Sequence, residues 1–259
     1  MDKFETALKA RPAGMGEEEW KLRLELAACY RIFAHMGWVE LIFNHITVRV
    51  PGPEKHYLIN PFGLHYSEVT ASNLIKVGLD GAPIHETPYT VNRAGFVIHS
   101  AIHDNREDAH CIMHVHTTAG MAIAQKEAGL SYDDFYGAQL WNEVAYHDFE
   151  GVTTRTEEQE SLVASLGQKH VMILRNHGLL VCQESIPTAF WLMWTLQRAC
   201  EIQVMAAAIP GPNRVLSNEV RALCANKEHK NVDPENRVAQ KIFDAMSRQA
   251  GIASFDVLI

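Results

Sequence analysis

Helical and extended hydrophobic patterns alternate along the whole chain. Apolar positions that recur every three or four residues are typical of amphipathic helices, and short runs of β-branched and apolar residues bounded by Gly or Pro are typical of strands. The first pattern predicts helices over 17–35, 92–106, 119–127, 156–168, 185–208, 217–225 and 234–250, with a short one near Thr70. The second predicts strands over 41–50, 56–62, 110–118 and 144–149, one ending at Asp80-Gly81, and a strand-turn-strand unit over 170–182. Interspersed strands and helices indicate a layered α/β architecture.

Two breaks in this pattern divide the chain. Residues 1–16 precede the consecutive glutamates that favour a helix start, so we expect a loosely attached N-terminal arm there. Beyond Pro210-Gly211-Pro212 the sequence becomes more polar. We therefore expect one domain over 17–212 and a C-terminal helical extension over 213–259, which packs on that domain or on a neighbouring subunit.

Composition narrows the classes of partner and compartment. The 259 residues are 47% hydrophobic and 21% charged, as in a globular protein. A net charge of −8 repels phosphate backbones and anionic lipid, so neither nucleic acid nor a membrane is expected as a partner. No run approaches ~18 apolar residues, and the N-terminus lacks the apolar core of a secretory signal. The five cysteines form no CxxC pair, which indicates free thiols in a reducing compartment, the cytoplasm.

The predicted strand over 110–118 carries a His-x-His pair. Alternate residues of a strand face the same way, so His114 and His116 project together from Cα atoms about 6–7 Å apart. Their imidazoles can converge on one ion. The alternative is a pair of packed or surface histidines, although burying an imidazole without a partner costs free energy. His177, in the turn of the strand-turn-strand unit, is a second candidate that becomes informative when taken together with the pair.

Short motifs in a fixed order carry a resemblance to a known family. They are Asn44-His45-Ile46-Thr47-Val48-Arg49, Leu58-Ile59-Asn60-Pro61-Phe62-Gly63, Leu79-Asp80-Gly81, His99-Ser100-Ala101-Ile102, His114-Val115-His116 and Asn176-His177-Gly178. In this order and spacing the chain resembles the class II aldolase/adducin family over roughly residues 20–210. Together with the alternating elements, the resemblance implies a single-domain, three-layer α/β/α fold whose central sheet is mostly antiparallel and flanked by helices.

The resemblance also implies a site and its chemistry. The metal ligands of the family fall on His114, His116 and His177, which would hold one divalent ion: zinc first, with manganese or iron as alternatives. Three neutral imidazoles leave coordination positions open for a substrate. In family aldolases the ion polarises a ketone oxygen and stabilises an enolate-like intermediate, while a carboxylate moves the proton. Family members act on small molecules and typically form homotetramers.

The expected carboxylate is missing from this sequence. Sugar-phosphate aldolases of the family carry a glutamate four residues before the position of His99, and here that position is Gly95. Serines that help to hold phosphate are replaced by Arg93 and Ala94, and a small hydroxyl residue by Phe62. From the phosphate pocket we expect Asn44 and Gly63 to remain as substrate-binding residues. The Asn-x-Ala-Gly-Phe pattern of this segment, which begins at Asn92, resembles the adducin-like branch.

Three residues are candidates for the lost function. His99 lies on the predicted helix one turn after Gly95, and His147 stands beside Asp148, so either imidazole can serve as a catalytic acid or base. Arg93 can bind a substrate carboxylate through two hydrogen bonds. The alternatives are a locally packed helix histidine, a surface loop pair and a solvated arginine.

Two functional hypotheses follow from the sequence. The first is a metal-dependent carbon–carbon lyase, an aldolase or decarboxylase, that acts on a small hydroxy or keto compound, including carboxylated ones, through a metal-stabilised enolate. The second is a non-catalytic, adducin-like binding or scaffold protein that keeps the metal site. The retained histidines favour the enzyme, and Gly95 favours the scaffold. Adducins owe their cytoskeletal role to long tails, and this sequence shows no basic tail after the expected extension, which again favours the enzyme.

Overall fold

The computed structural model describes residues 6–151, 158–225, 237–252 and 254–259. The α-helices are α1 (Glu17–Met36), α2 (Arg93–Asn105), α3 (Thr118–Ala124), α4 (Phe135–Ala138), α5 (Glu158–Leu166), α6 (Ile186–Ala207), α7 (Asn218–Ala225) and α8 (Arg237–Gln249). The strands are β1 (His45–Arg49), β2 (Tyr57–Ile59), β3 (Ile75–Val77), β4 (Cys111–Val115), β5 (Val144–His147), β6 (Val171–Leu174) and β7 (Gly178–Gln183). None of the helices in these ranges is long and apolar enough to cross a membrane.

The strands form one seven-stranded sheet in the order β3-β2-β1-β4-β7-β6-β5. Neighbouring strands are antiparallel except for β5 and β6, which are parallel. The central pairs set the register of the later site, because His45 of β1 lies opposite His114 of β4, and His114 lies opposite Leu180 of β7.

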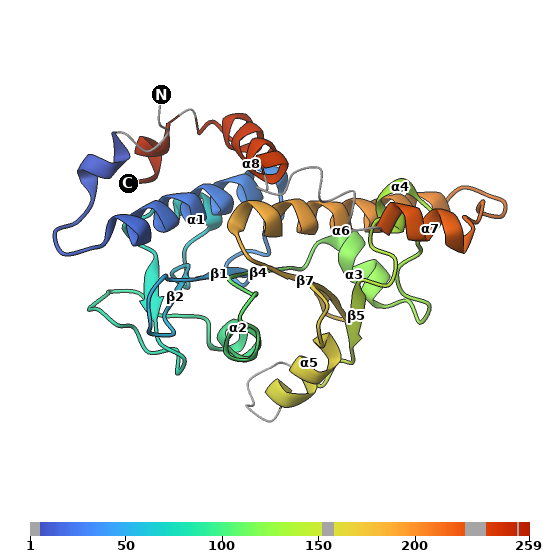
Figure 1. The fold of residues 1–259 in the computed structure, drawn as a ribbon, viewed down its shortest axis with the longest axis horizontal. Coiled ribbons are helices and arrows are strands. Elements are labelled where there is room, and N and C mark those ends of the chain that lie inside the picture. Colours follow the sequence, from blue (N-terminus) through green and yellow to red (C-terminus); the bar gives the residue numbers. More distant parts are fainter. Residues whose placement is uncertain (1–5, 152–157, 226–236, 253) are drawn as a thin grey trace.

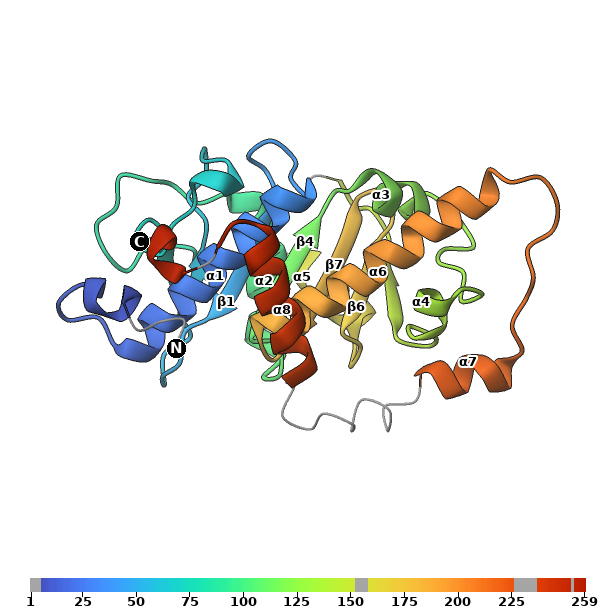
Figure 2. The same ribbon diagram turned by 90° about the horizontal axis from the view of Figure 1, so that it is seen from above.

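Helices cover both faces of this sheet (Figure 1). On one face, α1 and α6 pack on the largest hydrophobic cluster, and α8 crosses both of them (Figure 2). On the other face, Ile98 and Ile102 of α2 and Leu162 and Leu166 of α5 pack against a second cluster. The prediction of a single α/β domain with a mostly antiparallel sheet between helical layers is therefore confirmed.

Helix boundaries follow local chemistry that the sequence already carries. Glutamates fill the first turn of α1, and Gly37 ends it in the left-handed conformation with φ 70°. The hydroxyl of Ser185 accepts a hydrogen bond from the Thr188 amide, and Pro187 lies in the first turn of α6. The Thr117 hydroxyl likewise accepts from the Gly120 amide at the start of α3, directly after the His-x-His pair.

Two predicted elements are wrong in part. The strand expected over 41–50 begins at His45. Leu41 lies in a turn with a positive φ of 53°, which is incompatible with the extended backbone of a strand. The helix expected near Thr70 is a turn instead. There the Thr70 amide donates to Asn73 Oδ1 and the Asn73 amide donates to Thr70 Oγ1, as at a helix start, but β3 begins at Ile75 and leaves room for one turn only.

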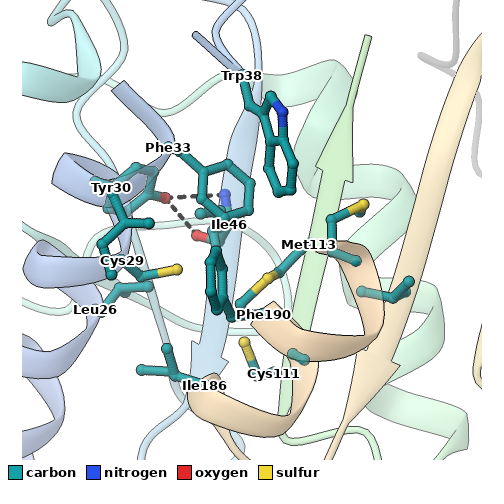
Figure 3. Packing of buried hydrophobic residues seen from close by; sticks show 14 of the residues in the cluster. Leu26, Cys29, Tyr30, Phe33, Trp38, Ile46, Cys111, Met113, Ile186 and Phe190 are labelled. Atoms are coloured by element: carbon teal, nitrogen blue, oxygen red, sulfur yellow. Dashed lines mark hydrogen bonds between the residues drawn. The ribbon is translucent and has the colours of Figure 1, made fainter. Parts of the chain in front are cut away.

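Tyr30 of α1 ties the helical layer to the start of β1 (Figure 3). Its buried hydroxyl accepts hydrogen bonds from the amides of Ile46 (2.9 Å) and Asn60 (3.2 Å) and donates to the Ile46 carbonyl oxygen at 2.5 Å. One phenol therefore fixes the backbone next to His45 and the end of β2.

Candidate metal centre

Three histidines meet at one end of the central strands. His114 is on β4, His116 follows β4 by one residue, and His177 lies in the turn between β6 and β7. That turn is closed by Asn176, whose φ is 55°, and by the His177 amide, which donates to the Leu174 carbonyl oxygen. We call His114, His116 and His177 the histidine triad.

The nitrogen atoms of the triad lie within reach of one ion. One ring nitrogen from each residue falls within 4.8 Å of the other two. The Nε2 atoms of His114 and His116 are 2.7 Å apart. Two nitrogens on one tetrahedral zinc ion lie about 3.3 Å apart, given bonds of about 2.0–2.1 Å. Small rotations that open this pair and draw His177 inward would therefore complete the ligand set.

The backbone prepares His114 for this role. Its Nδ1 is 2.9 Å from the Leu179 carbonyl oxygen, which can only accept, so the proton must be on Nδ1. Nε2 therefore carries the lone pair that a metal needs, and the bond fixes the ring plane. His116 then donates through Nε2 to His114 Nε2. Binding of an ion would require this proton to leave or to move to Nδ1.

Burial keeps the triad uncharged at neutral pH. It lowers the pKa of His114 well below its ordinary value, and repulsion from His177 and His116 adds to the shift. Burial likewise lowers the pKa of His177 to about 4 and lowers the pKa of His116, an effect that Glu40 partly offsets. Neutral imidazoles are the form that binds metal ions, so the donor set fits a divalent cation.

Gly178 lets the strands approach closely beside the triad. A Cβ at this position would lie 2.5 Å from the Val115 carbonyl oxygen and 3.0 Å from the His116 ring. Any other residue would have to push β7 and β4 apart, so glycine is a packing requirement next to His177.

A buried chain of hydrogen bonds sets the protonation of His99. His103 Nδ1 donates to the Ala109 carbonyl oxygen at 2.8 Å, so its Nε2 must accept from the Thr47 hydroxyl at 2.8 Å. The Thr47 oxygen in turn accepts from His99 Nδ1 at 2.7 Å. His99 Nε2 is then an acceptor, and it has no hydrogen-bond partner among the residues described.

His45 lies between these hydrogen-bonded residues and the triad. Its ring centroid is 4.3 Å from that of His99 and 5.6 Å from that of His114. The side chain is buried, its Nδ1 has no hydrogen-bond partner in the described part of the chain, and burial lowers its pKa to about 3.

A family model for the Class II Aldolase and Adducin N-terminal domain matches residues 24–204. This chain belongs to the class II aldolase and adducin family. A Caulobacter vibrioides protein named "Putative aldolase class 2 protein" is 46% identical over 205 residues, which cover 79% of this chain and 80% of that protein. Alpha-adducin of Rattus norvegicus is 48% identical over 193 residues, covering 73% of this chain but 26% of the adducin. Among solved structures, the L-fuculose 1-phosphate aldolase from Glaciozyma antarctica has a TM-score of 0.79 at 29% identity, covering 95% of this chain and 97% of that one.

The other family positions predicted from sequence lie in different settings. His99 and Asn44 are buried, and Asn44 Oδ1 has no partner within the described ranges. His147 ends β5, is 3.0 Å from the Ser165 hydroxyl through Nδ1, and lines a small cavity together with His177. Gly63 lies exposed in a turn with φ 100°. Arg93 begins α2, and its side chain lies outside the described residues.

The sequence-based hypothesis missed three polar residues of this family member's site. His45, Thr47 and His103 occur in or near recognised motifs, but none was assigned a role. The available signal was the alternation His45-x-Thr47, because both side chains of a strand with this spacing face the same helix. The helix that packs against this strand could not be identified from the sequence, so the contacts of Thr47 with His99 and His103 could not be predicted.

His103 provides a pH-dependent prediction that is independent of metal. Burial lowers its pKa from 6.5 to about 3, so the unfolded chain binds its proton over a range in which the folded protein does not. The stability that comes from keeping His103 neutral is therefore fully present above about pH 6.5, and it is lost as the pH falls towards 3. A His103→Asn variant should lose less stability over this range, by up to about 1.4 kcal/mol per pH unit.

Urea unfolding from pH 7 to 4 measures this difference. The exposed His85→Asn change is the matched control and should leave the slope of stability against pH unaltered. Equal slopes for His103→Asn and wild type would contradict the neutral, buried state of His103.

Proposed function

We propose that this protein is a metal-dependent carbon–carbon lyase that acts on a small hydroxy or keto substrate. The observation that carries the proposal is the convergence of the histidine triad, with His114 locked by the Leu179 carbonyl oxygen in the tautomer that presents Nε2. A divalent ion held there would supply positive charge for a substrate oxygen on which negative charge develops. Zinc is our first candidate, with manganese and iron as alternatives.

The surrounding residues support this role in distinct ways. The strands of the central sheet hold His114 and the turn of His177 in rigid backbone, which favours a fixed ligand geometry. His99, an acceptor at Nε2 and oriented through Thr47, can receive a proton, as can His147 beside His177. Asn44, Gly63 and Arg93 remain our proposed substrate-binding residues.

Gly95 separates the proposed reaction from sugar-phosphate aldol cleavage. That position cannot transfer a proton, so we favour cleavage or decarboxylation of a compound with its own carboxylate. In either reaction one carbon–carbon bond breaks, and its electron pair passes towards the substrate oxygen near the triad. We further propose a homotetramer, and an organisation into an arm (1–16), a catalytic domain (17–212) and an extension (213–259).

A scaffold protein like adducin is the alternative function, and the similarity to alpha-adducin favours it. The aligned part is 26% of that protein, so the remaining adducin segments have no counterpart in the comparison. The scaffold hypothesis also keeps the triad, so turnover of a substrate, and not the triad itself, distinguishes the two functions.

A substrate screen tests the proposal. Protein loaded with Zn²⁺, Mn²⁺ or Fe²⁺ is incubated with hydroxy-keto acids and sugar phosphates, and carbon–carbon cleavage is followed by NMR. We expect turnover of a carboxylated substrate that is abolished in His177→Ala and retained in the surface control His85→Ala. Absence of bound metal and of turnover in the wild type would favour the scaffold.

A further inference from the structure

His45 occupies the space that a side chain at position 95 would need. A Cβ built on Gly95 falls 1.6 Å from both Cδ2 and Nε2 of His45, and 2.7 Å from Cε1. Real Cβ atoms never approach other heavy atoms so closely, and this neighbour is a ring held in a buried position. His45 and Gly95 therefore form a matched pair, in which the imidazole from β1 fills the place of a side chain from α2.

This matched pair borders the triad. His45 lies directly opposite His114 in the sheet register, so both side chains leave the same face at the same level. The exposed fraction of His45 is 3% and that of His114 is 2%, so His45 is as accessible as a proposed metal ligand. Its Nδ1 and the neighbouring His99 Nε2 both lack protein partners within the described residues. These two ring nitrogens line the wall between β1 and α2, and each remains able to form a hydrogen bond with a polar ligand.

The charges around this wall favour an anion. Three neutral imidazoles would leave the full positive charge of a bound divalent ion uncompensated by the triad. Among the described residues, the groups whose charge shifts the pKa values of His45, His99 and His114 are other histidines. Within the described ranges, the carboxylate whose charge raises the pKa of a triad member is Glu40, which acts on His116. A glutamate at position 95 would add a negative charge beside His45, and the matched pair prevents it.

We propose that His45 is a specificity-determining residue, whose imidazole excludes a carboxylate from position 95 and so makes the site selective for a small carboxylate-bearing substrate. This inference rests on the metal site and the carboxylated substrate of the proposed function, and it adds the residue that selects this class of ligand. The steric part of the inference does not depend on metal, which allows the two to be tested separately.

The first experiment measures the coupling of the two positions without metal. Gly95→Ala should lower the unfolding temperature, because its Cβ must displace the His45 ring. Adding His45→Ala should recover stability relative to Gly95→Ala, although His45→Ala alone removes buried ring contacts. If the two changes are additive in a double-mutant cycle of urea unfolding, the matched pair does not exist and the inference is wrong.

The second experiment measures charge selection with oxalate as the probe. Isothermal titration compares zinc-loaded wild type with the double variants His45→Asn/Gly95→Glu and His45→Asn/Gly95→Gln, which differ only in the charge at position 95. We expect oxalate affinity to fall about 10-fold or more from the Gln to the Glu variant, as repulsion between unit charges at short range requires. Zinc content after titration shows that oxalate has not removed the ion.

The outcomes separate the two proposals. Failure of the wild type to bind Zn²⁺, Mn²⁺ or Fe²⁺ would overturn the proposed function. Zinc binding in all three proteins, with equal oxalate affinity in the Glu and Gln variants, would overturn the selective role of His45 and leave the metal site intact.

Discussion

Replacing His114 by alanine will abolish high-affinity zinc binding. His114 is the most buried residue of the triad, and the hydrogen bond from its Nδ1 to the Leu179 carbonyl oxygen leaves the lone pair on Nε2. Loss of a partner that merely orients a metal ligand costs about 10–100-fold in affinity, so loss of the ligand itself should cost more. Two imidazoles would remain, and His116 would lose the neighbour that its Nε2 now contacts. Competition titration with a chromogenic chelator measures the change.

Two controls make this result specific to the triad. His85→Ala removes an exposed histidine elsewhere and should leave the affinity unchanged. Circular dichroism should show that His114→Ala remains folded, because its backbone still pairs with β1 and β7. A folded His114→Ala protein that binds zinc as tightly as the wild type would show that the triad is a packed histidine cluster.

The long apolar elements were predictable from the sequence because apolar runs and the residues that begin or end them are local features. Helix α6 was expected over 185–208 and spans Ile186–Ala207, and its start is encoded by Ser185 and Pro187. The strand-turn-strand unit was also anticipated, since apolar β6 and β7 flank the turn that carries His177. Spatial convergence of the triad, by contrast, was inferred from family resemblance, because no local spacing links His177 to His116.

The structure adds what depends on contacts between distant segments. The absence of a glutamate at position 95 could be read from the sequence, but the ring that fills its place could not. That ring comes from β1, and Gly95 is on α2, so the sheet register and the helix position must both be known. For the same reason, the series of hydrogen bonds from Ala109 to His99 could not be predicted from the sequence, because its members belong to β1, α2 and a loop.

Replacing Tyr30 by phenylalanine will destabilise the protein while leaving the core volume almost unchanged. The hydroxyl is the acceptor for the amides of Ile46 and Asn60, and both amides are enclosed by the core. A buried amide that loses its partner costs about 1–3 kcal/mol, so we expect a loss of about 2–5 kcal/mol in the free energy of unfolding. Because Ile46 follows His45, the start of β1 should also exchange its amide hydrogens faster.

Tyr66→Phe is the matched control for this prediction. Tyr66 is equally buried and its ring lies 4.6 Å from that of Tyr30, but its hydroxyl has no hydrogen-bond partner among the described residues. Removing an unpartnered hydroxyl relieves a desolvation cost, so this variant should be as stable as the wild type or more stable. Urea unfolding of both variants measures the difference. Equal stabilities would mean that water replaces the Tyr30 hydroxyl, and that the anchor between α1 and β1 depends on packing of the ring alone.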